Sequence, residues 1–260
     1  MVLFVNEAQR FAALWRSYRW STISSVVVHA VIFPVLMLLF DSLAARYGNG
    51  YGTARQLQSL IGFLVWYLCM KLMVAMPTMV EEESVLGTLE NVMLTAVAFE
   101  KTLVLRTVVM MLRLGLETAL LGTVLSLLLG LTLSFTPGTA FVTLLLLLGS
   151  CGVGFALAGL ALLYKSVSSI SSVIGNLALL LSGALVPLDG LGMIFTVLKY
   201  GFPMTWGISL LRQLTLTPGF LNTAELAGLT LQTMGLLGLG WLVFSRCLQR
   251  ARELAGLASH

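Results

Sequence analysis

Residues 81–95 read EEESVLGTLENVMLT and hold four of the chain's eleven carboxylates within their first ten positions. The sequence on either side is almost entirely apolar, so this stretch interrupts two long hydrophobic segments. Charged side chains are costly in hydrocarbon and favourable in water. The stretch therefore belongs in water and its flanking segments belong in lipid, and this division decides the fold.

The composition indicates an integral membrane protein. Of the 260 residues, 58% are hydrophobic and 10% are charged, with a mean hydropathy of +0.97, whereas about a quarter of the residues in soluble domains are charged. The apolar runs are long enough for helices, which need about 20 residues to cross a bilayer. We therefore predict an all-α, polytopic fold with residues 1–260 as a single transmembrane domain.

Apolar runs predict six transmembrane helices, at about 21–40, 57–79, 107–133, 139–164, 167–186 and 226–244. Residues 3–20 place aromatic side chains at helical spacing with arginines between them, which predicts an amphipathic helix in the membrane interface. Glycine and proline interrupt residues 188–225 too often for a crossing, which predicts re-entrant helices on the outer side. No small-residue cleavage site follows the first apolar run, so we expect no removable signal peptide.

The basic residues orient this topology. Cytoplasmic loops of membrane proteins carry an excess of lysine and arginine. The predicted topology places eleven basic residues at the inner side and only Arg46, Arg55, Lys199 and Arg212 outside. We therefore expect a cell-membrane protein with both termini cytoplasmic and with residues 80–102 as a cytoplasmic loop.

The sequence shows no motif for catalysis. It has no phosphate-binding loop, no metal-ligand spacing and no arrangement of nucleophile and base, and it contains two histidines. We expect no enzyme activity, no metal and no cofactor bound by this chain. The net charge of +4 is explained by its distribution about the membrane, so no nucleic-acid partner is predicted.

Three charges fall inside predicted crossings. Arg113 and Glu117 lie four residues apart on one helix face, and counting along the helices places Lys71 at a similar depth. Such charges line a substrate path or form a structural ion network, and we favour the network because one acid and two bases satisfy one another. His29 has no acidic neighbour in its crossing, so we expect a neutral imidazole bonded to an adjacent helix.

Two motifs carry a resemblance to a known family. Gly87-Thr88-Leu89-Glu90 follows the acidic cluster, and Leu94-Thr95-Ala96 comes next. This order resembles the inner loop of type-2 ABC exporter permeases, although Ala96 stands where the family usually has proline. Residues 182–188 (SGALVPL) and 203–207 (PMTWG), followed by Arg212, are similar to the family's pattern around its re-entrant helices. The resemblance covers roughly residues 3–245.

The resemblance implies a dimer of this subunit bound to two copies of a separate ABC ATPase, which binds ATP and magnesium. It implies that the inner loop couples to the ATPase through Glu81, Glu82, Glu83, Gly87, Thr88, Leu89, Glu90 and Thr95. Apart from the resemblance, we predict an outer gate in the re-entrant segment, at Pro187, Leu188, Pro203, Thr205 and Trp206, although an aromatic belt at the membrane interface explains Trp206 equally well.

On this interpretation the chain is the permease of an ATP-driven exporter whose cargo is amphiphilic, either a drug-like molecule or a lipid. Short outer loops and spans dominated by Leu, Val and Gly favour such cargo over a lipid-linked glycan or polysaccharide, which is the alternative within the family. An alternative of another class is a proton-coupled carrier or channel that uses Glu117 and His29. A non-transporting scaffold is a third, for which the interrupted outer segment has no evident use.

Overall fold

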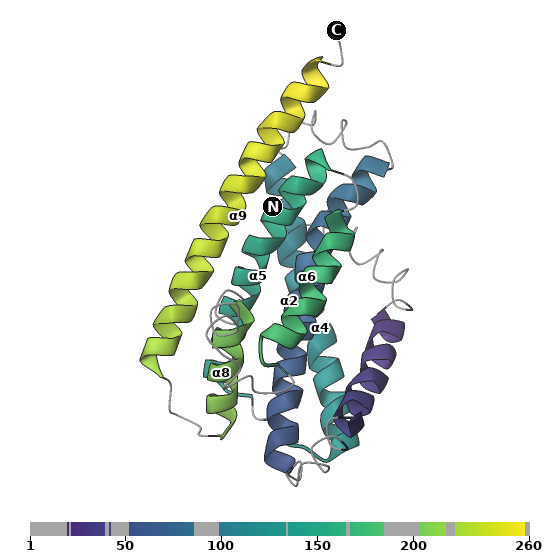
Figure 1. The fold of residues 1–260 in the computed structure, drawn as a ribbon, viewed down its shortest axis with the longest axis vertical. Helices are drawn as coiled ribbons and strands as arrows, with labels where there is room; N and C mark the ends of the chain where they lie inside the picture. The colour runs from purple at the N-terminus through teal and green to yellow at the C-terminus, as the bar shows by residue number, and fades with distance from the viewer. Residues whose placement is uncertain are drawn as a thin grey trace.

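The chain folds as a bundle of helices (Figure 1). The computed structural model describes residues 20, 22–39, 42, 52–85, 99–133, 135–164, 167–184, 203–216 and 222–257. These residues contain no strand and form the first helix (Thr22–Leu39), α2 (Thr53–Val85), α4 (Phe99–Leu129), α5 (Pro137–Leu163), α6 (Val167–Leu181), α8 (Pro203–Leu216) and α9 (Thr223–Leu257). The predicted all-α class is confirmed for this part of the chain.

Five of the helices are long and apolar enough to cross a membrane: the first helix, α2, α4, α5 and α9. The multi-pass membrane fold is therefore confirmed. The predicted fifth crossing corresponds to α6, which has 15 residues, and α8 within the predicted re-entrant segment has 14. The count of six crossings, the interfacial helix at 3–20 and the re-entrant geometry stay predictions, since much of these segments lies outside the described residues.

Several helices have bounds that differ from the predicted crossings. α2 continues to Val85, so Glu81, Glu82 and Glu83 lie in its last turns. α9 continues past Arg246, Arg250 and Arg252 to Leu257. α4 ends at Leu129, four residues early, because Gly130 adopts a φ of +65°, the left-handed conformation that ends helices. A hydrophobic run predicts only the part of a helix that crosses the lipid. The helix itself can continue into water, because its backbone hydrogen bonds do not depend on apolar side chains.

The next helix begins at a clear signal in the sequence. Thr136 caps α5 by accepting a hydrogen bond from the Thr139 backbone N–H, and the Thr139 side chain accepts one from the Thr136 N–H. Pro137 is the first residue of the helix, where its missing N–H costs nothing. Residues 136–138 therefore form the N-terminal turn of α5.

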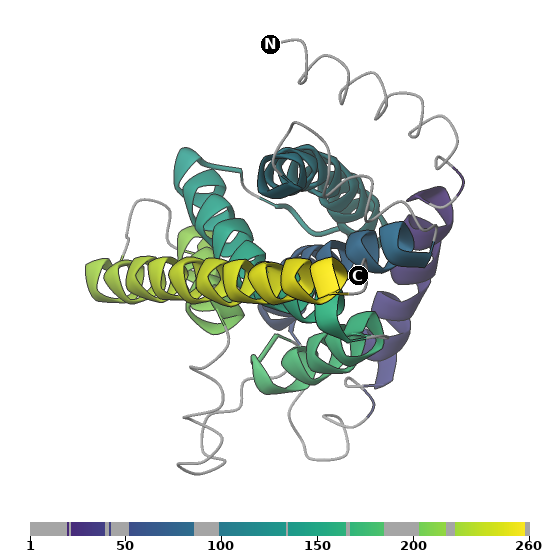
Figure 2. The same ribbon diagram turned by 90° about the horizontal axis from the view of Figure 1, so that it is seen from above.

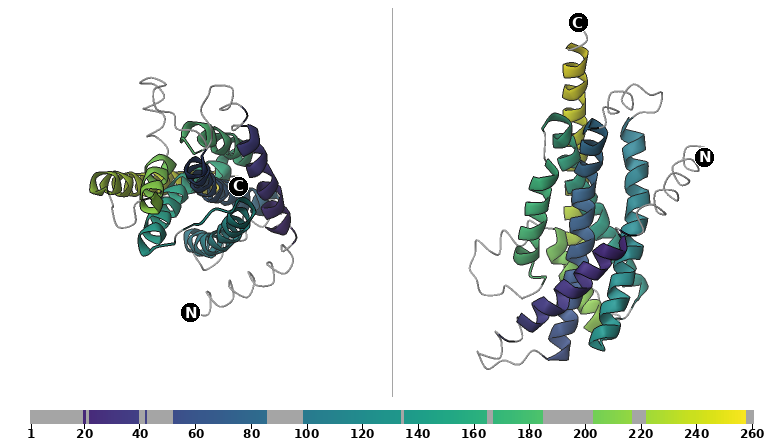
Figure 3. Two further views of the ribbon diagram at one scale, coloured as in Figure 1. Left: turned by 90° about the horizontal axis from the view of Figure 1, so that it is seen from below. Right: turned by 90° about the vertical axis from the view of Figure 1, so that its right-hand side faces the viewer.

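α2 lies in the interior of the bundle, and 72% of its most apolar stretch of 18 residues is buried. α9 packs along α5 on one side of α2, and the first helix lies on the opposite side, as both the side view and the view from above show (Figures 1 and 2). Figure 3 shows the first helix crossing α2 at a steep tilt. In the first helix and in α9, only 17% of the corresponding 18-residue stretch is buried. Both helices therefore keep faces for lipid or a partner.

Glycines bring α5 and α9 into backbone contact. A Cβ added to Gly240 of α9 would lie 2.6 Å from the carbonyl carbon of Gly152, and one added to Gly159 would lie 2.7 Å from the Cα of Phe244. Thr233 of α9 also donates a hydrogen bond of 3.2 Å to the carbonyl oxygen of Leu145 on α5. Small residues at such crossings let transmembrane helices approach closely, so this contact holds α9 on the bundle.

Candidate functional site

Glu81 connects two helices at the end of the bundle where α2 ends and α4 and α6 begin, here called the loop end. Its carboxylate accepts hydrogen bonds from the backbone N–H of Ser168, at 2.8 Å, and from the Ser168 hydroxyl, at 2.5 Å. Ser168 is the second residue of α6, where backbone N–H groups lack a partner within the helix and a negative charge is favourable. Glu81 therefore caps α6 from the last turns of α2.

Glu83 connects α2 to α4. Its carboxylate forms an ion pair with Arg106 at 2.8 Å, and the Arg106 and Glu83 side chains are 18% and 13% exposed. Of the three glutamates predicted to meet an ATPase, two thus bind neighbouring helices of the same chain, and Glu82 is exposed. The other predicted coupling residues, Gly87, Thr88, Leu89, Glu90 and Thr95, lie outside the described residues.

A polar cluster lies deeper in the bundle, between the first helix, α2 and α4. Glu117 of α4 is 5% exposed, and its carboxylate accepts a hydrogen bond from the Tyr67 hydroxyl of α2. That hydroxyl also lies 3.0 Å from the Ser25 hydroxyl of the first helix. Lys71 donates to the same Ser25 oxygen at 2.8 Å, and its ammonium lies 5.4 Å from the centre of the Tyr67 ring.

Arg113 of α4 belongs to the same cluster. Its Nη2 donates a hydrogen bond of 2.9 Å to the Thr22 hydroxyl of the first helix, and its buried Nε has no hydrogen-bond partner. Within the described residues, no ion pair shorter than 4.0 Å joins Lys71, Arg113 and Glu117. Lys71 and Glu117 are thus connected through the hydroxyls of Ser25 and Tyr67, whereas Arg113 meets the first helix separately at Thr22. The direct contacts of an ion network are not present among the three charges within the described residues.

His29 also lies beside this cluster. The predicted hydrogen bond to an adjacent helix is not found among the described residues, and the imidazole instead meets its own helix. Its Nδ1 lies 2.7 Å from the carbonyl oxygen of Ser25, one turn earlier in its own helix. Its ring packs edge-on against the Tyr67 ring at 4.5 Å between centroids. The imidazole can reach this carbonyl because Ser25 and His29 are four residues apart and share one helix face.

A sequence comparison places most of these helices in a known family. Residues 2–216 match the family model described as ABC-2 type transporter. The chain belongs to the ABC-2 type transporter family. No curated protein matched the chain. Membership makes the chain a transmembrane permease subunit, of a family that normally works with an ABC ATPase partner, and α9 follows the matched residues.

Arg212 holds α8 of the permease against two neighbouring helices, a role that the sequence did not predict. Its guanidinium donates to the carbonyl oxygens of Gly183 at 3.1 Å and Ala184 at 2.8 Å, just after α6, and to that of Gln58 on α2 at 3.0 Å. Carbonyl groups at a helix end lack partners within the helix. Arg212 therefore fastens α8 to the ends of two neighbouring helices.

The residues predicted to form an outer gate in the permease are partly described. Pro203 begins α8, Thr205 is buried, and a Cβ on Gly228 of α9 would touch the Trp206 ring at 3.4 Å. Pro187 and Leu188 lie outside the described residues. The described part of the predicted gate therefore packs near the start of α9.

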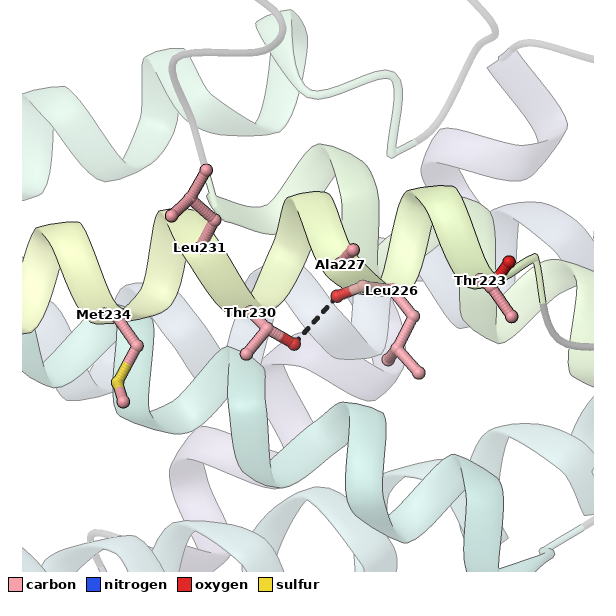
Figure 4. A pocket seen from close by; sticks show the side chains of 6 residues that line it. All are labelled: Thr223, Leu226, Ala227, Thr230, Leu231 and Met234. Carbon is pink, nitrogen blue, oxygen red and sulfur yellow. Dashed lines mark hydrogen bonds between the residues drawn. The ribbon is translucent and has the colours of Figure 1, made fainter.

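A shallow depression lies nearby on α9 of the permease (Figure 4). It is lined by residues of that one helix: Thr223, Leu226, Ala227, Thr230, Leu231 and Met234. The Thr230 hydroxyl is used within the helix, since it donates to the carbonyl oxygen of Leu226. Nothing here resembles a catalytic or metal site, and the described residues contain no group of three His, Cys, Asp or Glu that would hold a metal ion.

The hydroxyl partners in the polar cluster were missed at the level of sequence, although a signal was present. Thr22, Ser25 and His29 recur at intervals of three and four residues, which places them on one face of the first helix. Tyr67 and Lys71 are four residues apart on α2. A polar stripe inside an apolar crossing indicates a face turned toward other polar groups of the bundle.

Proposed function

We propose that this permease is the membrane subunit of an ATP-driven exporter. It moves an amphiphilic cargo, a drug-like molecule or a lipid, out of the cytoplasm or the inner leaflet by alternating access. Two copies of the permease associate with two copies of a separate ABC ATPase, which supplies ATP and magnesium. The protein lies in the cell membrane with both termini in the cytoplasm, as the distribution of basic residues predicts.

The observation that supports coupling is the way the loop end is tied together. Glu81 binds α6, and Glu83 binds Arg106 at the start of α4. The loop between α2 and α4 therefore leaves from a point where three helices are joined through side chains. A partner that displaces this loop would displace the ends of three helices together, because rigid packed elements transmit movement better than single side chains.

Glu82 provides the test of a partner contact. It is exposed and lies between two glutamates that already bind α6 and α4. Charge reversal at Glu81 or Glu83 would disturb the fold as well as a partner, whereas reversal at Glu82 changes the surface alone. Glu253 is likewise an exposed carboxylate in the last turns of a long helix, α9, so Glu253→Lys serves as the matched control.

The experiment co-expresses the permease with an ATPase subunit encoded beside it and measures how much ATPase co-purifies in detergent. We expect Glu82→Lys to lower the co-purified ATPase severalfold and Glu253→Lys to leave it unchanged. Reconstituted complexes should then deplete a fluorescent amphiphile from the ATPase-facing leaflet only when ATP is supplied. Failure of the wild-type permease to retain any ATPase would refute the proposal, and full retention by Glu82→Lys would remove Glu82 from the contact.

A second candidate is a proton-coupled carrier, which the polar cluster favours. Buried Glu117 is hydrogen-bonded to Tyr67, and the Tyr67 ring contacts His29. Two titratable groups are therefore connected through one side chain inside the membrane, where such groups often serve proton transfer. This candidate requires cargo flux driven by a pH gradient without ATPase, and flux abolished by Glu117→Gln. Flux that depends on ATP and ignores the gradient excludes it.

A further inference from the structure

The polar cluster holds more positive than negative charge. Lys71 and Arg113 face one carboxylate, that of Glu117, and no other described acidic side chain bonds to them. At about 1.5 Å per residue, Lys71 lies about 12 Å from the nearer end of the apolar run 57–79, and Arg113 lies about 9 Å from the nearer end of the run 107–133. Side chains of this length extend only a few ångströms toward an interface, so the excess charge stays at membrane depth.

The carboxylate of Glu117 forms no ion pair with Lys71 or Arg113 among the described residues. Glu117 accepts the Tyr67 hydroxyl, whereas Lys71 and Arg113 each donate to a hydroxyl of the first helix. A hydroxyl satisfies a donor but neutralises no charge. An ammonium has three donors and a guanidinium five, and the Nε of Arg113 is buried without any partner. Both cations therefore keep donor capacity and charge for an anion.

The surroundings of Arg113 are apolar and open on one side. Leu112 and Leu116 on the same helix are 66% and 60% exposed, and Leu116 lies three residues from Arg113, on a neighbouring part of the surface. The first helix, which carries the hydroxyl partners of both cations, is the most peripheral part of this region (Figure 3). An alkyl chain in the lipid phase can lie along these leucines while its head group meets the cations.

We propose that Lys71 and Arg113 bind the anionic head group, such as a phosphate, of an amphiphile. The proposal rests on the proposed transport function and assigns the class of cargo. Hydrogen bonds between charged partners are stronger than those to hydroxyls, so an anion displaces Ser25 and Thr22 from the two cations. The first helix then loses two of its polar contacts with α2 and α4, which links binding to the position of that helix.

Binding to the purified full-length permease tests this site without an ATPase. The permease is placed in phosphatidylcholine nanodiscs and titrated with a dansyl-labelled alkyl phosphate and with a dansyl-labelled alkyl trimethylammonium of equal chain length. Energy transfer from the tryptophans reports saturable binding. We expect the phosphate to bind at least about tenfold more tightly, and Lys71→Gln and Arg113→Gln each to remove about tenfold of that affinity.

The control variants distinguish the effect of the cations at this site from the effect of cations elsewhere on the protein. Arg250→Gln removes an exposed cation of α9 and should leave binding unchanged, and Lys71→Arg should restore most of the affinity. Adding phosphatidylglycerol to the discs identifies the source of the anion. Competition assigns the site to a membrane lipid and lack of competition assigns it to a separate cargo, and both results support an anionic amphiphile. If inorganic phosphate displaced the labelled alkyl phosphate equally well, the ligand would need no alkyl chain, and the proposal of an amphiphile would be overturned.

Equal affinity of the wild-type chain for the phosphate and the trimethylammonium compound would overturn the proposal, even if no variant folds. Unchanged phosphate affinity in Lys71→Gln and Arg113→Gln variants that elute as the wild type does would also overturn it. Because no ATPase is present, these failures would leave ATP-driven export untouched. Conversely, a permease that retains no ATPase but binds the phosphate selectively would refute the transport proposal alone.

Discussion

The contact between α5 and α9 provides a prediction whose size follows from the structure. A Cβ on Gly240 would lie 2.6 Å from the carbonyl carbon of Gly152, whereas carbon atoms settle at about 3.5 Å or more. Gly240→Ala must therefore push the two helices apart by at least about 1 Å, since the carbonyl oxygen of Gly152 lies closer still to the added Cβ. A radial gap of that size forfeits up to about half of the dispersion energy of each contact.

We expect this separation to cost about 1–3 kcal/mol, the usual range for overpacking a close contact. Alanine also has the better helix propensity, by about 1 kcal/mol, so the loss must be measured against a glycine that makes no contact. Gly238, two residues away on the same helix, would have nothing within 4 Å of an added Cβ. Gly238→Ala therefore carries the propensity gain alone and is the matched control.

The assay is thermal unfolding in detergent, followed by the height of the folded peak in size-exclusion chromatography. For a chain of this size, each kcal/mol shifts the midpoint by about 2–4 °C. Gly238→Ala should melt at or slightly above the wild-type midpoint, and Gly240→Ala should melt about 2–12 °C below Gly238→Ala. Coincident melting curves for the two variants would refute the inferred backbone contact between α5 and α9.

Two further substitutions probe side chains that join helix ends. Glu81→Ala should lower the free energy of unfolding by about 1–3 kcal/mol because α6 loses its cap, while Glu82→Ala should change it little; equal melting midpoints for the pair would contradict the cap. Arg212→Ala should cost a similar amount, about 1–3 kcal/mol, because the carbonyl oxygens of Gly183 and Ala184, beyond the end of α6, lose their donor. Faster proteolysis between α6 and α8 would accompany that loss, and wild-type protease resistance would argue against the role of Arg212.

The helices were predictable from the sequence because their cause is local. Long apolar runs need lipid, and helices satisfy their backbone within one segment, so the first helix, α2, α4, α5 and α9 were each placed correctly. Their ends were less predictable where the cause lies outside the apolar run. α2 continues through Glu81 and Glu83 because these side chains find partners on α6 and α4.

The sequence predicted the depth of the polar cluster in the membrane, but it did not predict which side chains bond to one another. Counting residues along two helices brought Lys71, Arg113 and Glu117 to one level of the membrane. In the structure Lys71 and Glu117 are linked through Ser25 and Tyr67, and Arg113 reaches the same first helix at Thr22. The choice of partner depends on how α2 and α4 rotate against the first helix, which no spacing within one helix specifies. Glu117 therefore binds the hydroxyl of Tyr67, where pairing by charge alone had favoured the cations.

Arg212 illustrates the same limit from the outer side. Its position in residues 188–225, which glycine and proline interrupt, counted it among the predicted outer charges. A single sequence shows neither where α6 ends nor that α8 returns beside that end. The structure places its guanidinium on three carbonyl oxygens of α2 and the end of α6. A contact between segments 28 or more residues apart belongs to tertiary packing, so only the residue type, a cation with five donors, was available in advance.

The two levels at which α2 and α4 are joined explain how movement at the loop end would reach the interior. The Glu83–Arg106 ion pair joins the helices near the loop end, and the Tyr67–Glu117 hydrogen bond joins them in the interior. Eleven residues of α4 separate the two contacts, about 16 Å along the axis, so neither helix can rotate without breaking one of them. We infer that α2 and α4 move as a unit. The first helix meets that unit through the hydroxyls bound to Lys71 and Arg113, so an anion that displaced these hydroxyls would loosen it from the unit.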